Sequence, residues 1–217
     1  LRRQRQMCIR DRGINQVQVN NKAGMTFGAA LRSILRADPD VVLIGEIRDQ
    51  ETANIAIEAS LTGHLVLSTL HTNDAPSAVT RLTEMGVEPF LLSSSLAAVM
   101  AQRLARRLCK KCKRQDTATE AELRTLGVPH MPDTPLPTIW RPVGCRECAN
   151  TGYSGRVAIQ QVMGVDSTME DLIARGATSI DIDKAAKEQG MTTLRKDGWQ
   201  KALQGITSVE EVLRVTV

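Results

Sequence analysis

Four cysteines in this sequence have the spacing of a metal site. Cys109 and Cys112 form one C-x-x-C knuckle, and Cys145 and Cys148 form a second. Two such knuckles can surround Zn²⁺ tetrahedrally with four thiolates, and basic neighbours of the first knuckle favour the thiolate form. Disulfides are the alternative, but they are disfavoured in the cytosol, and a redox C-x-x-C needs no matching second pair. We therefore predict a structural Zn²⁺, because nothing nearby indicates an open coordination position.

A carboxylate that follows a short apolar stretch is the second chemically capable group. Val41–Ile44 runs into Gly45 and then Glu46 within the segment 35–49, LRADPDVVLIGEIRD. Such a run, bounded by Asp-Pro-Asp and Gly, is typical of a strand buried on both faces of a parallel sheet, and chemistry gathers at the carboxyl edge of such sheets. Glu46 at that edge can hold Mg²⁺ through water or orient a water that attacks a phosphate. The alternative is a solvated acid at the end of a strand.

Two histidines flank the next apolar stretch. Residues 65–70 predict another buried strand, which ends at His71. This side chain can contact a γ-phosphate as a donor or, as a neutral base, help to position water. His64 precedes the strand and should lie at the opposite edge of the sheet. A lone histidine is more often structural than catalytic, so position alone favours His71 over His64 and leaves both assignments open.

Helix and strand signals place these groups in an α/β fold. Residues 14–20 alternate polar and apolar side chains, as a half-buried strand does. Thr26, Asp49 and Asp74 each precede a helical pattern, and we expect them to cap helices. The first of these helices should end before Asp38, because a proline follows that residue. Alternating strands and helices predict βαβ units and a parallel sheet.

The chain after Pro89 is predicted to be helical and then basic. The expected helix carries an apolar stripe at helical spacing, formed by Leu92, Leu96, Val99 and Met100. Basic residues then cluster around the first knuckle, at Arg103, Arg106, Arg107, Lys110, Lys111, Lys113 and Arg114. A solvated face around the metal site is the favoured interpretation. Nucleic-acid binding is less favoured because no aromatic residues interleave for stacking; an acidic neighbouring subunit or anionic lipid headgroups are further candidates.

The remaining elements are predicted from caps and turns. Between and just after the knuckles we expect a short helix at 119–126, a proline-rich loop at 129–142 and a returning strand at 157–162. Helix starts are predicted at Ser167, Ser179, Thr192 or Thr193, and Ser208. Glu211 should complete a capping box with Ser208, and Trp199 should be a core residue. This region shows no catalytic constellation, so a packing or docking role is expected.

Composition and charge narrow the functional classes. Of 217 residues, 42% are hydrophobic, 24% are charged and 2% are aromatic, which indicates an aliphatic core large enough for one main domain plus a smaller module. No apolar run approaches the roughly 18 residues of a membrane helix, and no signal-peptide pattern opens the chain. Residues 1–12 hold five arginines and one aspartate and so carry the net charge of +4. The neutral remainder gives no global argument for nucleic acid. We interpret 1–12 as a non-native junction or a disordered basic tail.

The segments around Glu46 and His71 resemble motifs of a known family. LRADPDVVLIGEIRD resembles the signature of the secretion ATPases that drive type II secretion and type IV pilus assembly, and TGHLVLSTLHTNDA, residues 62–75, resembles their histidine box. The likeness continues through 86–109 and to SVEEVLRVT at the chain's end, so it covers residues 13–217. It implies a RecA-like P-loop NTPase core with ATP and Mg²⁺. It also implies a homohexamer, cytoplasmic and peripheral at a bacterial inner membrane through platform and linker proteins, with no nucleic acid.

Site roles follow from the same resemblance. It implies that Glu46 is the Walker B acid, with Arg48 beside it as a cofactor-binding residue. It also implies that His64 and His71 are histidine-box residues, which raises His64 above its positional ranking. A tetracysteine insert is similar to that of the secretion and pilus-assembly members rather than the retraction members. Sensor, intersubunit-finger and salt-bridge roles stay open for three arginines: Arg32, Arg36 and Arg48.

Two family features are missing from the sequence. No glycine is followed by lysine, so the phosphate-binding loop G-x-x-x-x-G-K-[ST] is absent, and the arginine-rich segment stands where the acidic box is expected, before Gly13. We therefore expect the C-terminal part of the enzyme, inactive when expressed alone. Its predicted parts are the segment 1–12, a RecA-like core without the Walker A loop (13–108), a tetracysteine zinc module (109–156) and a C-terminal helical subdomain (157–217).

Two functional hypotheses from different classes result. The first is part of a motor ATPase for type II secretion, with type IV pilus assembly as its alternative. The second is a non-catalytic, zinc-stapled interaction module.

Overall fold

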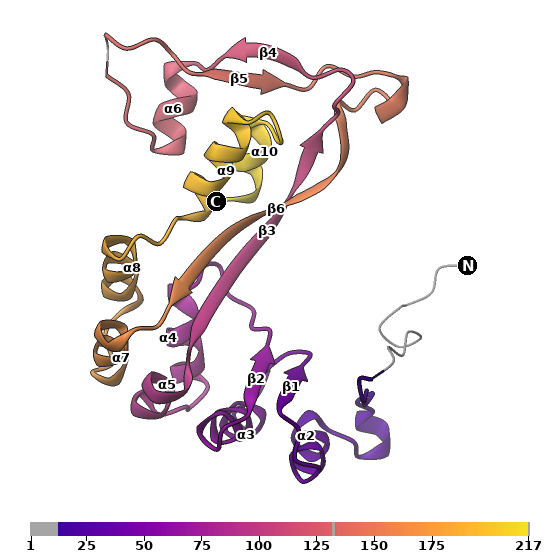
Figure 1. Ribbon diagram of the computed structural model, residues 1–217, viewed down its shortest axis with the longest axis vertical. Helices are drawn as coiled ribbons and strands as arrows, with labels where there is room; N and C mark the ends of the chain where they lie inside the picture. Colours follow the sequence, from indigo (N-terminus) through magenta and orange to yellow (C-terminus); the bar gives the residue numbers. More distant parts are fainter. Residues whose placement is uncertain (1–12, 132, 217) are drawn as a thin grey trace. The chain divides into compact units, whose positions relative to one another are not determined.

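The computed structural model describes residues 13–131 and 133–216. The described residues form two compact units (Figure 1): unit 1 comprises residues 13–71 and 81–95, and unit 2 comprises residues 72–80, 96–131 and 133–216. The predicted basic segment 1–12 lies outside the described residues. Within the described part, no helix is both long enough and apolar enough to cross a membrane.

A two-stranded parallel sheet organises unit 1. β1 (Val41–Ile44) pairs with β2 (Leu65–Ser68), and Ile44 lies opposite Ser68. α3 (Gln50–Leu61) connects the two strands, so the predicted parallel βαβ unit is confirmed.

The prediction that these strands are buried on both faces is wrong. Val42 and Ile44 are 4% and 5% exposed, whereas Val41 and Leu43 are 55% and 73% exposed. The strand predicted at 65–70 is shorter, and its side chains are exposed or half-buried. Successive strand residues point to opposite faces. One face of the sheet is therefore packed in the described chain, and the other presents its apolar side chains.

Helices begin at the predicted polar caps. The side chains of Thr26, Asp49 and Asp74 each accept the N–H of the third residue along, at 3.1, 2.8 and 2.9 Å. They precede α2 (Phe27–Leu35), α3 and α4 (Pro76–Glu84). Each cap satisfies a backbone donor that the first helical turn leaves without a partner.

The strand predicted over 14–20 is wrong. In the described residues, this region contributes only an isolated bridge between Asn20 and Met25, followed by the short 3₁₀ helix η1 (Asn21–Ala23). Alternation of polar and apolar residues makes a strand only where a neighbouring strand accepts its hydrogen bonds, and no described strand lies beside these residues.

Unit 2 is built on a long antiparallel ribbon (Figure 1). β3 (Ala98–Leu108) pairs with β6 (Tyr153–Gly164) over almost their whole length. The predicted return strand at 157–162 is therefore confirmed and is longer than expected. The predicted helix after Pro89 is partly wrong, because α5 (Pro89–Ser95) ends before the ribbon starts.

The prediction that Val99 and Met100 belong to a helix is wrong for a physical reason. From Ala98 to Ala105 exposure alternates residue by residue, with Ala101 and Ala105 buried. This period of two matches pairing with β6, which lies about fifty residues further along the chain. A pairing that distant outweighs the local helical spacing.

The chain between the two knuckles folds into a small hairpin and a helix. β4 (Arg114–Thr117) pairs antiparallel with β5 (Thr138–Arg141). The predicted short helix is confirmed as α6 (Glu120–Leu126), with a reciprocal capping box between Thr119 and Glu122. β5 lies inside the segment predicted to be a proline-rich loop.

The predicted C-terminal helices are all present. They are α7 (Ser167–Ala174), α8 (Ser179–Glu188), α9 (Leu194–Leu203) and α10 (Val209–Val215). At α10 only half of the predicted capping box forms. Ser208 Oγ accepts the Glu211 N–H at 3.4 Å, but the Glu211 carboxylate is bound to arginines instead.

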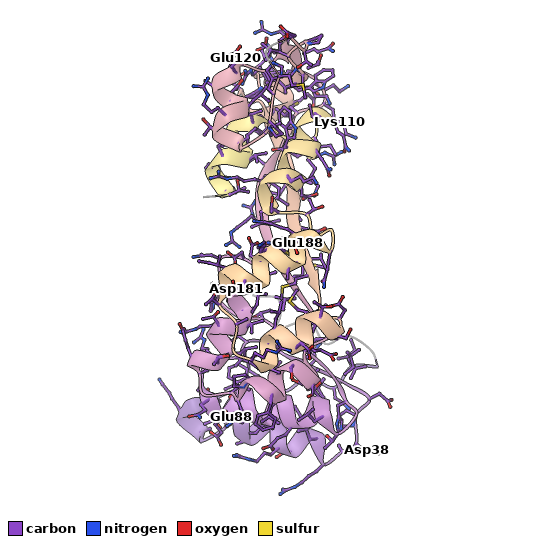
Figure 2. The ribbon with its side chains drawn as sticks, turned by 90° about the vertical axis from the view of Figure 1, so that its left-hand side faces the viewer. Asp38, Glu88, Lys110, Glu120, Asp181 and Glu188 are labelled. Carbon is purple, nitrogen blue, oxygen red and sulfur yellow. The ribbon has the colours of Figure 1, made fainter. Side chains whose placement is uncertain are left out.

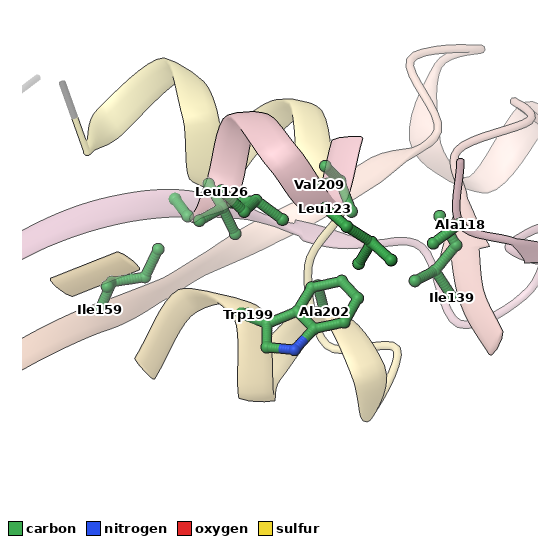
Figure 3. Close-up of a cluster of buried hydrophobic side chains, with 10 residues drawn as sticks. Ala118, Leu123, Leu126, Ile139, Ile159, Trp199, Ala202 and Val209 are labelled. Carbon is green, nitrogen blue, oxygen red and sulfur yellow. The ribbon is translucent and has the colours of Figure 1, made fainter. Parts of the chain in front are cut away.

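One hydrophobic core joins these elements in unit 2. Leu123 of α6, Ile139 of β5, Ile159 of β6 and Trp199 of α9 belong to the same buried cluster (Figure 3), and Trp199 is 8% exposed as predicted for a core residue. The region between the knuckles thus shares its core with the C-terminal helices. The predicted division at 108 and 156 follows sequence motifs and stays a prediction.

Candidate active site and metal centre

Three side chains meet at the carboxyl edge of the unit 1 sheet. Glu46 follows β1 and His71 follows β2, and because these strands are parallel neighbours, both residues lie at one edge. His71 Nε2 lies 3.4 Å from Glu46 Oε2, and the Arg48 guanidinium lies 2.7 Å from Glu46 Oε1. The structure therefore brings these predicted site residues together, while their chemical roles stay a prediction.

Backbone contacts beyond the strands hold this edge in place. The Ile47 N–H donates to the Thr69 carbonyl at 3.0 Å, and the Thr69 hydroxyl donates to the Gly45 carbonyl at 2.7 Å. Thr69 is absent from the predicted site residues, since nothing in its spacing distinguishes it from a strand residue. It ties the residue before Glu46 to the chain that leads into His71.

Electrostatics keep the Glu46 carboxyl ionised. The hydrogen bond from Arg48 is the largest influence and lowers its pKa; burial opposes this, and the contact with His71 lowers the pKa further. The Glu46 side chain is 23% exposed, while those of Arg48 and His71 are 67% and 87% exposed. An ionised, reachable carboxylate of this kind can accept from water or hold Mg²⁺.

His64 lies away from this group, directly before the first residue of β2. Its Nδ1 lies 3.0 Å from the Ala59 carbonyl and 3.2 Å from the Thr62 hydroxyl. The next residue, Leu65, pairs with Val41 at the start of the sheet. The position matches the expectation from the sequence, and the structure does not bring His64 to Glu46.

Arg32 and Arg36, whose roles the sequence also leaves open, differ from Arg48 in their ion pairs. Arg32 forms an exposed ion pair with Glu51 at 2.5 Å, and in the described residues Arg36 has no ion pair. The Arg32 pair is of the ordinary surface kind and contributes little to stability.

The four cysteines of the predicted metal site converge in unit 2. Their sulfur atoms all lie within 4.8 Å of one another. The Sγ atoms of Cys109 and Cys145 are 3.9 Å apart, and those of Cys112 and Cys148 are 3.8 Å apart. Zinc–sulfur bonds of about 2.3 Å in a tetrahedron place sulfur atoms about 3.8 Å apart. The tetracysteine cluster therefore fits Zn²⁺, and all four cysteines are free thiols rather than disulfides.

Backbone amides support negative charge on the cluster. Cys148 Sγ accepts the N–H groups of Cys145 and Gly152, each at 3.2 Å, and Cys112 Sγ accepts that of Gly144 at 3.3 Å. Burial would raise the pKa of Cys148, but these amides lower it to about 6, whereas burial raises the pKa of Cys145 to about 11. The Cys148 thiol is therefore ready to bind metal as the thiolate.

Two cations of the basic cluster around the first knuckle lie over aromatic rings of the protein. Arg106 lies over the Tyr153 ring at 4.1 Å and Lys113 over the Trp140 ring at 4.4 Å. Lys110, in contrast, lies on the exposed surface (Figure 2). The two aromatic rings are thus covered by the protein's own cations.

Comparisons with known proteins are consistent with these features. The family model described as Type II/IV secretion system protein matches residues 7–214. The chain is 55% identical over 204 residues to the type II secretion system protein E of Pseudomonas aeruginosa, covering 94% of this chain and 40% of that protein. It is 51% identical over 205 residues to the type IV pilus assembly ATPase PilB of Thermus thermophilus, covering 94% of this chain and 23% of that protein. The chain therefore spans less than half the length of these relatives.

Two solved structures share the fold. The pilus retraction motor PilT with bound ADP aligns with a TM-score of 0.60 and 23% identity, over 88% of this chain and 43% of that chain. The Legionella pneumophila ATPase DotB aligns with a TM-score of 0.59 and 21% identity, over 88% of this chain and 42% of that chain. The α/β fold of this chain is thus shared with these two proteins. Since the family model matches nearly the whole sequence, the chain belongs to the type II/IV secretion system protein family.

Proposed function

We propose that this chain is the C-terminal part of a hexameric motor ATPase that powers type II protein secretion through ATP hydrolysis. The observation that carries the proposal is the Glu46 carboxylate, held at a sheet edge between Arg48 and His71 at 2.7 and 3.4 Å. Type II secretion system protein E of Pseudomonas aeruginosa, at 55% identity, supports the choice of this process.

Each residue of the edge has a role in the proposed reaction. Glu46 orients the attacking water and is the residue that would hold Mg²⁺ through water; an ion bound there would supply positive charge to the phosphates of ATP. His71 donates to the γ-phosphate or helps to position the water. Arg48 supplies positive charge beside the nucleotide. For His64, the resemblance alone supports a place in the site.

The phosphate cradle of the proposed site comes from residues outside this chain. The sequence contains no G-x-x-x-x-G-K-[ST], and the backbone amides and lysine of that loop are what hold the phosphates in this class of enzyme. We therefore expect the purified chain to show no ATP turnover. Measurable turnover by the chain alone would refute this.

The test of the proposal is Glu46→Gln in the full-length protein that contains this chain. Hydrolysis should be lost while nucleotide binding, followed with a fluorescent ATP analogue, is retained. Glu84→Gln is a matched control, because it also removes a carboxylate paired with an arginine, here Arg81 at 3.3 Å, but away from the edge. Unchanged hydrolysis in the Glu46 variant would refute the motor assignment, and the zinc-stapled interaction module would remain as the hypothesis.

The assembly and the process are part of the same proposal. We place the protein in a homohexamer on the cytoplasmic face of a bacterial inner membrane, bound through platform and linker proteins of the secretion machine. Type IV pilus assembly is the second candidate, which the 51% identity to PilB of Thermus thermophilus favours. Restoring secretion in a strain without its type II ATPase, and failing to restore pili in a strain without PilB, would support the first.

A further inference from the structure

A buried carboxylate in unit 2 has no part in the proposed reaction. Glu211 of α10 is 1% exposed. Its Oε2 accepts the Arg106 backbone N–H at 2.8 Å, its Oε1 accepts the Arg106 guanidinium at 2.6 Å, and Arg214 donates to each oxygen at 2.8 Å. Burial would raise the pKa of Glu211, but the hydrogen bonds from Arg214 and Arg106 lower it to about 2. The carboxylate stays charged and fixes the groups that donate to it.

These contacts fall where β3 loses its regular partner. The pairing register between β3 and β6 shifts between Arg106 and Leu108, so the backbone there needs other hydrogen-bond partners. Residues 205–211, which we call the α9–α10 clamp, supply them. The Leu108 N–H donates to the Ile206 carbonyl at 2.9 Å, and the Thr207 hydroxyl donates to the Arg106 carbonyl at 2.8 Å.

The first zinc knuckle begins at the next residue. Cys109 is 3% exposed and directly follows Leu108. On the far side of the knuckle, the Lys113 ammonium donates to the Gly205 carbonyl at 2.7 Å. The clamp therefore holds the chain immediately before and immediately after the Cys109–Cys112 pair. Gly205 has φ +66°, and a Cβ there would lie 2.6 Å from the Trp140 ring, so the approach is close.

We propose that Glu211 is a positioning residue of the zinc site. It holds the end of β3 at the place where Cys109 must present its thiolate, although it does not touch the sulfur atoms. Groups that orient metal ligands from behind are worth about ten- to a hundredfold in metal affinity. Coupling between two sites is reciprocal, so bound Zn²⁺ also stabilises the attachment of α10.

The test compares zinc retention and stability in the same 217-residue chain. Glu211→Gln keeps the size of the side chain but removes the charge that binds both arginines. With Zn²⁺ as the probe and a chromophoric chelator as competitor, we expect zinc affinity to fall about tenfold. Asp166→Asn is the control. It weakens the cap of α7, where Asp166 accepts the Met169 N–H at 3.0 Å, and lies outside the clamp.

The comparison separates positioning from general destabilisation. A tenfold loss in the Glu211 variant, with wild-type affinity in an equally destabilised Asp166 variant, supports the proposal. Equal losses, or wild-type affinity in both variants, overturn it, as does failure of the wild-type chain to bind Zn²⁺. If Glu211→Gln does not fold, Thr207→Val decides, because it removes only the hydrogen bond to the Arg106 carbonyl. Unchanged affinity in that variant overturns the proposal.

Discussion

Arg141 of β5 connects three carboxylates, and its replacement by methionine should destabilise unit 2. The guanidinium binds both oxygens of Glu122 at 2.5 and 2.9 Å, Asp116 at 3.0 Å and Glu210 at 2.7 Å. The side chains of Arg141 and Glu122 are 19% and 18% exposed. Removing one partner of such a largely buried pair leaves the other charge buried and unpaired, which lowers the free energy of unfolding by about 3 kcal/mol. We expect a loss of this size at neutral pH, mostly from Glu122.

The pH dependence has a definite sign. The hydrogen bond from Arg141 lowers the pKa of Glu122, although burial opposes the shift. A carboxyl whose pKa is lower in the folded than in the unfolded state stabilises above its unfolded pKa, and this stability is lost as the pH falls through the folded value. The destabilisation by Arg141→Met should therefore shrink as the pH falls toward and below about 4.

The assay is urea unfolding followed by tryptophan fluorescence. Both tryptophans of the chain, Trp140 and Trp199, lie in unit 2, so the signal reports this unit. Glu122→Gln alone should also destabilise, but in the Arg141→Met background it should cost nothing or stabilise, because it removes a stranded charge. Arg124→Met is the matched control, since Arg124 is exposed and has no ion pair in the described residues. A loss under about 1 kcal/mol, or additive costs, would refute the reasoning.

Three more outcomes are expected at the two sites. In the full-length protein, His71→Gln should slow hydrolysis by about a hundredfold with nucleotide affinity retained, whereas His64→Gln should act on stability, because the His64 ring contacts the Ala59 carbonyl; equal rate losses would contradict this. Arg48→Met should raise the pKa of Glu46 toward its ordinary value, since the Arg48 hydrogen bond is its largest influence, and the acid limb of the rate profile should move to higher pH; an unmoved limb counts against it. A chelator should release zinc and make the four clustered thiols reactive toward a thiol reagent; reactivity that is the same before and after would exclude a bound ion.

Helix starts and the meeting of Glu46 with His71 could be read from the sequence because each depends on short-range rules. A cap such as Thr26 needs only the N–H of the third residue along, at 3.1 Å. Adjacent parallel strands linked by one helix must bring their ends to one edge, so strand order predicts that Glu46 and His71 are neighbours. The separation of 3.4 Å between the imidazole and the carboxylate depends in addition on the side-chain conformations.

The errors arose where distant residues compete with local ones. Val99 and Met100 fit a helix by spacing, yet each lies opposite a β6 residue, at Met163 and Val162. The prediction that the unit 1 strands are buried on both faces was wrong for a different reason. Their composition suits burial on two faces, but whether a second face is covered depends on packing partners, which a strand's own residues do not specify.

The capping box at α10 shows the same competition within one side chain. Ser208 and Glu211 have the spacing of a reciprocal cap, and the serine half forms at 3.4 Å. The other half would join a carboxylate to one neutral N–H, whereas Arg106 and Arg214 offer charged donors at 2.6 to 2.8 Å, which are about twice as strong. The charged donors prevail, and this is why a residue with a helix-start signature instead binds the end of β3. The spacing of Cys109 and Cys112 predicts a metal site. Glu211, which we propose positions the first knuckle, lies about a hundred residues further along the chain, so the local cysteine pattern could not have identified it.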